Sequence, residues 1–174
     1  METGEIYYDD GLLQYRGELK GGLPHGQGAA YYKNGDIAYK GRFKNGQPQG
    51  NGTAYQENGN KYYKGEFKEG KPDGRGSLYY ADGKLRYKGD FSNGLQNGQG
   101  VIYHPDGSIT YQGEFREGLQ TGQGVVFHKN GKVSYEGEFW QGMPHGQGIG
   151  YLEDGTILFQ GTWQYGIPQD KTAQ

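Results

Sequence analysis

The four histidines are the side chains of this sequence best suited to bind a metal or to move a proton. His104 and His128 occupy one position in neighbouring copies of a 24-residue repeat, and His25 and His145 share another position five copies apart. Strands of a sheet lie ~4.8 Å apart, so each two-strand copy advances ~10 Å. Ligands of one zinc ion must approach it to about 2.1 Å. The spacing therefore predicts surface and turn histidines and no metal site.

The other motifs do not favour catalysis or phosphate binding. The chain has no cysteine, and its carboxylates form a row rather than a close pair. Pairs such as Gly26 and Gly28 resemble the glycines of phosphate-binding loops, but they recur in six copies without the helix that such loops need. We therefore expect no catalytic residue and no cofactor, since an enzyme would need a deep polar pocket with converging titratable groups.

The element that must position all these side chains is the repeat itself. Its copies begin with an aromatic residue at position 1 and have glycine at position 3. The leading residues are Tyr15, Tyr39, Tyr63, Tyr87, Tyr111, Tyr135 and Phe159. A fixed period of this length is typical of a linear array in which each unit contacts only its neighbours.

The repeat predicts one array over residues 1–174. A half unit at 1–14 precedes six full units at 15–158, and a half unit with a cap follows at 159–174. In the cap, Asp170 and Thr172 replace glycines of the earlier units.

Each unit is expected to be a β-hairpin. Positions 1–6 alternate aromatic or glycine residues with polar ones, which predicts a half-buried strand. Positions 7–13, with glycine and often proline, predict a turn, and positions 14–18 a second strand. Pairs such as Asn34-Gly35 then predict the connection to the next unit. The expected fold is all-β, an elongated single-layer antiparallel meander of tandem β-hairpins with about 14 short strands.

The two faces of this sheet are expected to differ. Rings at positions 1, 5 and 17 would share one face and cover the glycine at position 3. On the reverse face, position 2 is often basic and position 4 mostly acidic, which predicts opposed rows of surface charge.

Composition excludes several classes of function. Net charge is −2, so the chain has no basic footprint for nucleic acid. It has no signal peptide and no apolar run of membrane-spanning length, and acidic neighbours neutralise the lysine rows. We therefore expect a soluble, cytoplasmic protein without membrane contact.

The units resemble the MORN family (membrane occupation and recognition nexus). The segment from Tyr63-Lys-Gly-Glu-Phe to Gly74-Arg-Gly76 has the family pattern, as does the segment from Tyr135-Glu-Gly-Glu-Phe to Gly148. The 24-residue period is one residue longer than usual and is similar to a bacterial variant found in antitoxin-like immunity proteins. The resemblance implies a twisted single-layer sheet, a role in protein contacts or assembly, lipid binding as a further expectation, and no catalytic residues.

Candidate partner-binding residues are those that break the pattern of their own position. Trp140 stands where other units have mostly lysine or arginine, and Tyr62 interrupts a position of small or mixed residues. The ring ladder is a further candidate if one side of it stays open to a peptide or helix. Its members are Tyr39, Tyr63, Tyr87, Tyr111 and Tyr135.

The ends of the sheet are candidates for contact between copies of the chain. An unpaired second strand at 5–9 and an unpaired first strand at 159–163 predict head-to-tail self-association. The residues concerned are Ile6, Tyr7 and Tyr8 at one end and Phe159, Thr162 and Trp163 at the other.

Together these features predict a non-enzymatic scaffold that binds another protein. Two alternatives remain open from the sequence. One is a toxin-neutralising immunity protein that covers the active site of a partner enzyme. The other is peripheral binding of lipid headgroups.

Overall fold

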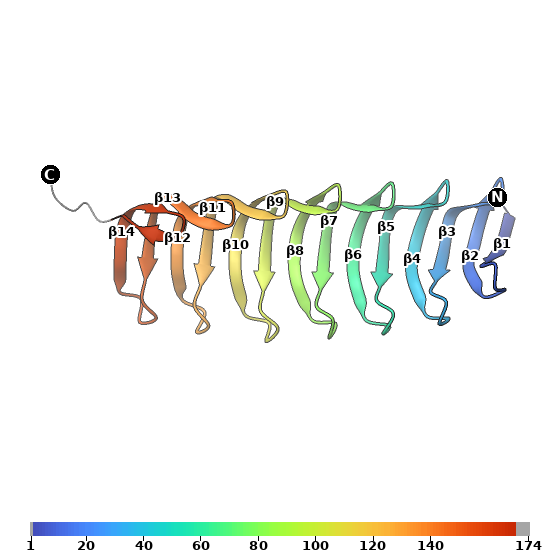
Figure 1. The fold of residues 1–174 in the computed structure, drawn as a ribbon, viewed down its shortest axis with the longest axis horizontal. Helices are drawn as coiled ribbons and strands as arrows, with labels where there is room; N and C mark the ends of the chain where they lie inside the picture. Colours follow the sequence, from blue (N-terminus) through green and yellow to red (C-terminus); the bar gives the residue numbers. More distant parts are fainter. Residues whose placement is uncertain (1, 170–174) are drawn as a thin grey trace. The chain divides into compact units, whose positions relative to one another are not determined.

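The computed structural model describes residues 2–169, and these residues form an all-β fold without a helix (Figure 1). The fold is a single open antiparallel sheet of 15 strands in sequence order, a meander of hairpins. The strands are β1 (Glu2–Tyr7), β2 (Leu13–Lys20), β3 (Leu23–Tyr31), β4 (Ile37–Lys44), β5 (Gln47–Tyr55), β6 (Lys61–Lys68), β7 (Lys71–Tyr79), β8 (Leu85–Ser92), β9 (Leu95–Tyr103), β10 (Ile109–Arg116), β11 (Leu119–Phe127), β12 (Val133–Trp140), β13 (Met143–Tyr151), β14 (Ile157–Gln164) and β15 (Ile167–Pro168). The predicted cap at Asp170 and Thr172 lies outside the described residues.

The chain divides into two compact units. The first contains residues 1–85 and 91–94, and the second contains residues 86–90 and 95–174. Within each unit, strands pack mainly against the strands that precede and follow them in the sequence. Residues 2–169 include no helix long and apolar enough to cross a membrane.

A two-residue turn joins the two strands of each repeat. In the turn between β4 and β5, Asn45 and Gly46 both have positive φ, 50° and 84°, and Lys44 pairs with Gln47 directly beyond them. Two central residues with positive φ make a type I′ turn, whose twist matches that of the flanking strands. The predicted turn over positions 7–13 is therefore too long, because only positions 7 and 8 form it. Positions 9–13 belong to a nine-residue strand such as β5, and a bulge in its pairing with β4 accommodates the extra residues.

A three-residue loop joins each repeat to the next, where the Asn-Gly and Asp-Gly pairs predicted a connection. In the loop of residues 33–35, which the pair of Tyr32 and Asp36 closes, Gly35 N donates to Tyr32 O (3.0 Å) and Tyr32 N donates to Asp36 O (2.8 Å). Asn34 accepts from Asp36 N through Oδ1 (2.9 Å), and of the two residues in the Asn-Gly pair only Gly35 has positive φ. This is a type I turn followed by a glycine bulge, so the hairpin was predicted correctly and its turn type is a finding of the structure.

The core is a ladder of rings that lie on glycines. Tyr63 is fully buried, and its hydroxyl donates to Glu66 O (3.0 Å). Its ring covers the cross-strand pair of Gly65 and Gly76, where a Cβ on either glycine would collide with it. The ring meets Phe67 edge to face with centroids 5.0 Å apart. The predicted shielding of glycine by aromatic rings is confirmed.

The rings predicted at position 17 do not join this ladder. Ala30 pairs with Tyr39 across β3 and β4, so position 16 shares the face of the ladder and position 17 lies on the reverse face. There, the Tyr151 hydroxyl donates to Glu136 Oε1 (2.5 Å), a side chain of position 2. The expectation was wrong because a shift of one residue moves a strand side chain to the other face.

Candidate interaction surface

The histidines lie in separate environments, and the prediction of surface and turn positions is correct for His104 and His128 but wrong for His25 and His145, which lie within strands. His128 contacts Tyr151 O through Nε2 (2.9 Å), and His104 Nδ1 lies 3.2 Å from Asp106 Oδ2. His25 and His145 are on β3 and β13, where the buried Nδ1 atom of each has no hydrogen-bond partner. Among residues 2–169 no group of three or more metal-ligating side chains comes together.

The acidic row at position 4 has a structural role that the sequence did not reveal. Glu18 Oε1 accepts from Gln27 N (2.9 Å), and Glu138 Oε1 accepts from Gln147 N (3.2 Å). The same bond recurs at Glu66, Asp90 and Glu114. These carboxylates therefore satisfy the backbone N–H of the bulge on the partner strand.

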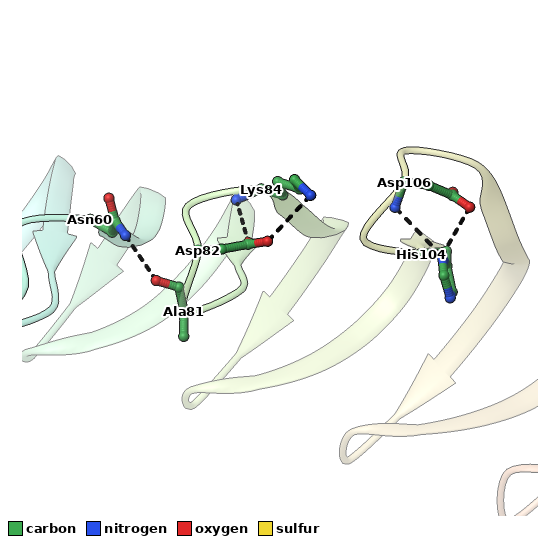
Figure 2. A network of polar contacts seen from close by, with 6 residues as sticks. All are labelled: Asn60, Ala81, Asp82, Lys84, His104 and Asp106. Atoms are coloured by element: carbon green, nitrogen blue, oxygen red, sulfur yellow. Dashed lines mark hydrogen bonds and ion pairs between the residues drawn. The ribbon is translucent and has the colours of Figure 1, made fainter.

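The loops carry a second set of contacts, between neighbouring repeats. In the first unit, Asn60 Nδ2 donates to Ala81 O of the following loop (2.8 Å), and Asp82 accepts from Lys84 N (3.1 Å), as Figure 2 shows. In the second unit, hydrogen bonds from the Ser108 side chain and backbone lower the pKa of Asp106 to about 2. The loop polar groups thus bond to backbone and to one another.

The five ladder tyrosines proposed as partner contacts are core residues. Their exposed fractions run from 0 to 5%, so no ring has an open side for a peptide or helix. They are Tyr39, Tyr63, Tyr87, Tyr111 and Tyr135. The condition under which they were candidates, an open ring face, is not met because each ring is covered by glycines below and by aromatic rings on its sides. Binding of a partner by these residues is itself untested.

Trp140 and Tyr62 are exposed, as a partner contact requires. Trp140 is 47% exposed at the end of β12, and Tyr62 is 50% exposed near the start of β6. Their role in binding stays a prediction.

Trp140 belongs to a larger exposed apolar group in the second unit, which we call the apolar strip. Its members, all between 39% and 63% exposed, are Leu95, Leu119, Trp140, Met143 and Ile167. Four of them are the first residue after a type I′ turn, at the start of β9, β11, β13 and β15. Trp140 pairs with Met143 across one of these turns, so their side chains share a face.

The strip follows the rim of type I′ turns in the second unit. Leu119 lies beside the turn of the next repeat, since a Cβ placed on Gly142 would be 4.0 Å from its Cδ2. The equivalent residues of the first unit are Leu23, Gln47 and Lys71. Position 9 of the repeat is therefore mixed in the first unit and apolar throughout the second, where its cross-strand partners include Arg116 and Gln164 as well as Trp140.

The strip went largely unnoticed in the sequence because exposed leucines are ordinary one at a time. Positions 6 and 9 become neighbours only through the two-residue turn, and the expected turn over positions 7–13 kept them apart. The signal that could have found the strip is the run of apolar residues at position 9 in the last four copies.

The candidate residues at the two ends of the sheet differ in exposure and in their contacts. Ile6 is half-buried and pairs with Tyr15, while Tyr7 is 53% exposed and bonds to Glu5. The Tyr8 hydroxyl donates to Tyr31 O (2.8 Å). At the other end, Phe159 is half-buried, Thr162 exposed and Trp163 buried, with Trp163 Nε1 donating to Gly148 O (3.1 Å). Contact between copies through these residues is not tested by this arrangement.

Comparison with known proteins supports the repeat found in the fold. The family model described as MORN repeat matches six segments: residues 15–37, 39–61, 63–84, 87–109, 111–133 and 135–157. No curated protein matches the chain. Each matched segment begins at the tyrosine of position 1, and together the segments cover most of the sequence. The chain, with six repeats of about 24 residues, therefore belongs to the MORN repeat family.

Proposed function

We propose that this MORN array is a non-enzymatic scaffold, and that its second unit binds a partner protein through the apolar strip. The observation that carries the proposal is the strip itself. Five exposed apolar side chains follow one rim of the second unit, whereas the rim of the first unit is mixed. Clustered exposed apolar side chains that include Trp and Met are typical of protein interfaces.

The charge of the second unit indicates the chemistry of the partner. Its described residues carry five basic and eight acidic side chains. Glu117 lies in the turn directly before Leu119, and Glu138 lies two residues before Trp140. A partner surface with apolar side chains surrounded by lysine or arginine would complement both the apolar side chains and the acidic charge of this unit. Trp140 and Leu119 are the expected anchors, because large side chains near the centre of an interface carry most of the binding energy.

The test is affinity capture from cells, compared between matched variants and followed by binding of the purified partner. Leu119→Lys and Trp140→Ala should each lose the same partner. Leu23→Lys, which makes the same change at the equivalent rim position of the first unit, should retain it. If wild type and all three variants capture the same proteins with the same affinity, the strip is not the binding surface.

Two narrower roles remain predictions that this capture would separate. If the partner is an enzyme whose activity the chain abolishes, the protein acts as a toxin-neutralising immunity protein. The 24-residue period, which is similar to that of antitoxin-like immunity proteins, favours this role. If binding is instead to vesicles with anionic headgroups and the capture yields no protein, peripheral lipid binding is favoured. Capture of a non-enzymatic partner favours the scaffold.

A further inference from the structure

We propose that copies of this chain associate head to tail, with β1 of one copy pairing with the open edge of β14 in the next. The inference concerns the sheet edges and does not depend on the apolar strip or on a partner protein.

The first step is the open edge of β14 in the second unit. β14 pairs with β13 from Ile157 to Trp163. On its other side, β15 pairs only with Trp163 and Gln164, and Gln169 N donates to Thr162 O (2.8 Å). Within the described residues, the part of β14 that contains Phe159, Gln160 and Gly161 therefore has no strand beside it.

The second step is the phase of β1 within the repeat. Gly4 pairs with Gly17 as Gly28 pairs with Gly41, and Ile6 pairs with Tyr15 as Ala30 pairs with Tyr39. β1 is thus the later part of a second strand, and it corresponds to residues 50–55 of β5.

The two fragments together make up one complete strand. β5 runs from residue 47 to residue 55, and residues 167–169 correspond to its first three positions. Residues 2–7 of β1 correspond to the remaining six. A β1 strand from a second copy would supply these remaining positions and would give β14 the pairing that β4 has with β5. In sequence, the chain's own residues 170–174 stand at the same repeat positions, so the proposal requires β1 to be the better partner for β14.

The third step is the fit of side chains across the new ladder. In the existing hairpin of β4 and β5, the Tyr39 ring lies over Gly52 of the partner strand, where no Cβ would fit. β1 has Gly4 at this position, so it can accept the Phe159 ring in the same way. In sequence, the equivalent residue of the chain's own C-terminal half unit is Thr172. Glycine in β1 is therefore the better partner for Phe159.

The new ladder also places Glu5 opposite Gln160, since the equivalent residues Thr53 and Lys40 are paired. Charge at residue 160 should then control association, because opposite charges directly across an antiparallel pair stabilise it and like charges destabilise it. Gln112 is the same repeat position in β10, which already has a strand on each side, and provides a matched control.

The experiment is sedimentation velocity of the full chain from low to high micromolar concentration. The wild type should gain mass with concentration beyond a dimer, because a head-to-tail contact repeats from copy to copy. Gln160→Glu should weaken association and Gln160→Lys should tighten it, each about two- to fivefold, the change expected for one cross-strand pair. The same substitutions at Gln112 should leave it unchanged.

A second variant tests the other edge. Gly4→Val should abolish association while the fold survives, because the new side chain meets only the flexible end of Leu19 within its own chain. Circular dichroism would establish folding, and Thr3→Val is the control on the opposite face. A wild type that stays monomeric at every concentration would overturn the proposal. Association that is unchanged by the substitutions at residues 4 and 160 would also overturn it. Capture of a partner through the apolar strip could succeed in either case, so the two proposals fail separately.

Discussion

At the scale of single residues, the fold depends on glycines that have no room for a side chain. Gly76 has Tyr63 directly above it, and that ring is held between Phe67 and Phe91, each with centroids 5.0 Å away. Gly59 has a different reason to be glycine, because its φ is +80° and nothing lies within 4 Å of an added Cβ. Replacing Gly76 therefore measures the cost of a side-chain collision, and replacing Gly59 measures the cost of an unfavourable backbone conformation.

We expect Gly76→Ala to lower the free energy of unfolding by about 3 kcal/mol or more, since the Tyr63 ring cannot move away without displacing its neighbours. Gly59→Ala should cost only about 1 kcal/mol, the penalty of a left-handed conformation for alanine. Denaturant unfolding of both variants measures the difference. Equal losses at the two sites would show that the ring does not confine Gly76.

The ladder tyrosines should also make the fold sensitive to alkali. Burial raises the pKa of Tyr39 and Tyr135 to about 12, from an ordinary value of 10.0. Below pH 10 these phenols are neutral in both the folded and the unfolded protein, so their full contribution to the free energy of unfolding is present. Between pH 10 and 12 the unfolded chain loses protons first, so the free energy of unfolding falls by about 1.4 kcal/mol per pH unit for each such tyrosine.

Denaturant unfolding at a series of alkaline pH values tests this dependence. Tyr39→Phe should reduce the slope of the unfolding free energy against pH by the contribution of one proton. It also loses the hydrogen bond to Arg42 O (3.1 Å), which lowers stability at every pH. Tyrosinate absorbance should rise in two stages, with the ladder residues ionising only as the sheet unfolds. Complete ionisation while the circular dichroism is still native would contradict the buried ladder.

At the scale of the strand and turn, the type I′ turns contain strain that the sequence can relieve. The first turn residue has a φ near 50° in six copies and is asparagine in two of them, Asn45 and Asn93. Glu69 occupies the same position with a φ of 50°. Asparagine adopts this conformation at a lower cost than glutamate, because its short polar side chain can hydrogen-bond to the nearby backbone.

Glu69→Asn should therefore raise the free energy of unfolding by about 0.5–1 kcal/mol. The bond from its backbone N to Gln49 Oε1 (3.2 Å) does not involve the replaced side chain and should persist. Glu57→Asn, in a three-residue loop where the residue lacks positive φ, is the control and should give no comparable gain. Thermal unfolding of both variants decides the matter, and an equal gain in each would indicate a general effect of charge.

The sequence predicted the core and the hairpins but not the boundaries of the strands. Tyrosine at position 1 and glycine at position 3 recur at a fixed period, and this correctly predicted that the ring covers the glycine. The rings of position 17 were wrongly placed on the same face. Pro24 and Gly26 look like turn residues in sequence, yet they lie in β3, at a bulge with Gly26 at a φ of 65°. Glycine with positive φ occurs in bulges as well as in turns, so composition alone cannot separate them.

That single error hid most of the candidate surface. With the turn placed over positions 7–13, Trp140 and Met143 have no reason to be neighbours, and Trp140 is the only member of the apolar strip that stands out in the sequence. A two-residue turn makes them a cross-strand pair. The partner itself lies beyond such reasoning, because the repeated residues specify how neighbouring strands pack and leave only the departures from the repeat to indicate what binds.

At the scale of the whole molecule, the array should tolerate the loss of a complete repeat. Within the first unit, β3 pairs with β4 through the same register by which β5 pairs with β6, with Ala30 opposite Tyr39 and Ala54 opposite Tyr63. Residues 39–62 can therefore be removed so that Ala38 precedes Tyr63 and β3 meets the strand that begins there. Phe67 would then replace Phe43 against Tyr15, whose present centroid distance from Phe43 is 5.0 Å.

We expect this deletion to give a folded protein with native-like circular dichroism, a lower unfolding midpoint and a smaller dependence on denaturant, since one unit and one interface are lost. Deletion of residues 39–50 is the matched control, because it removes half a repeat and joins Ala38 to Asn51. In that variant the glycine and tyrosine positions no longer coincide across strands, so rings would meet side chains in place of glycines. It should fail to fold. If the deletion of a whole repeat were as damaging as that of half a repeat, stability would have to come from contacts beyond neighbouring strands, and the nearest-neighbour account of this array would be wrong.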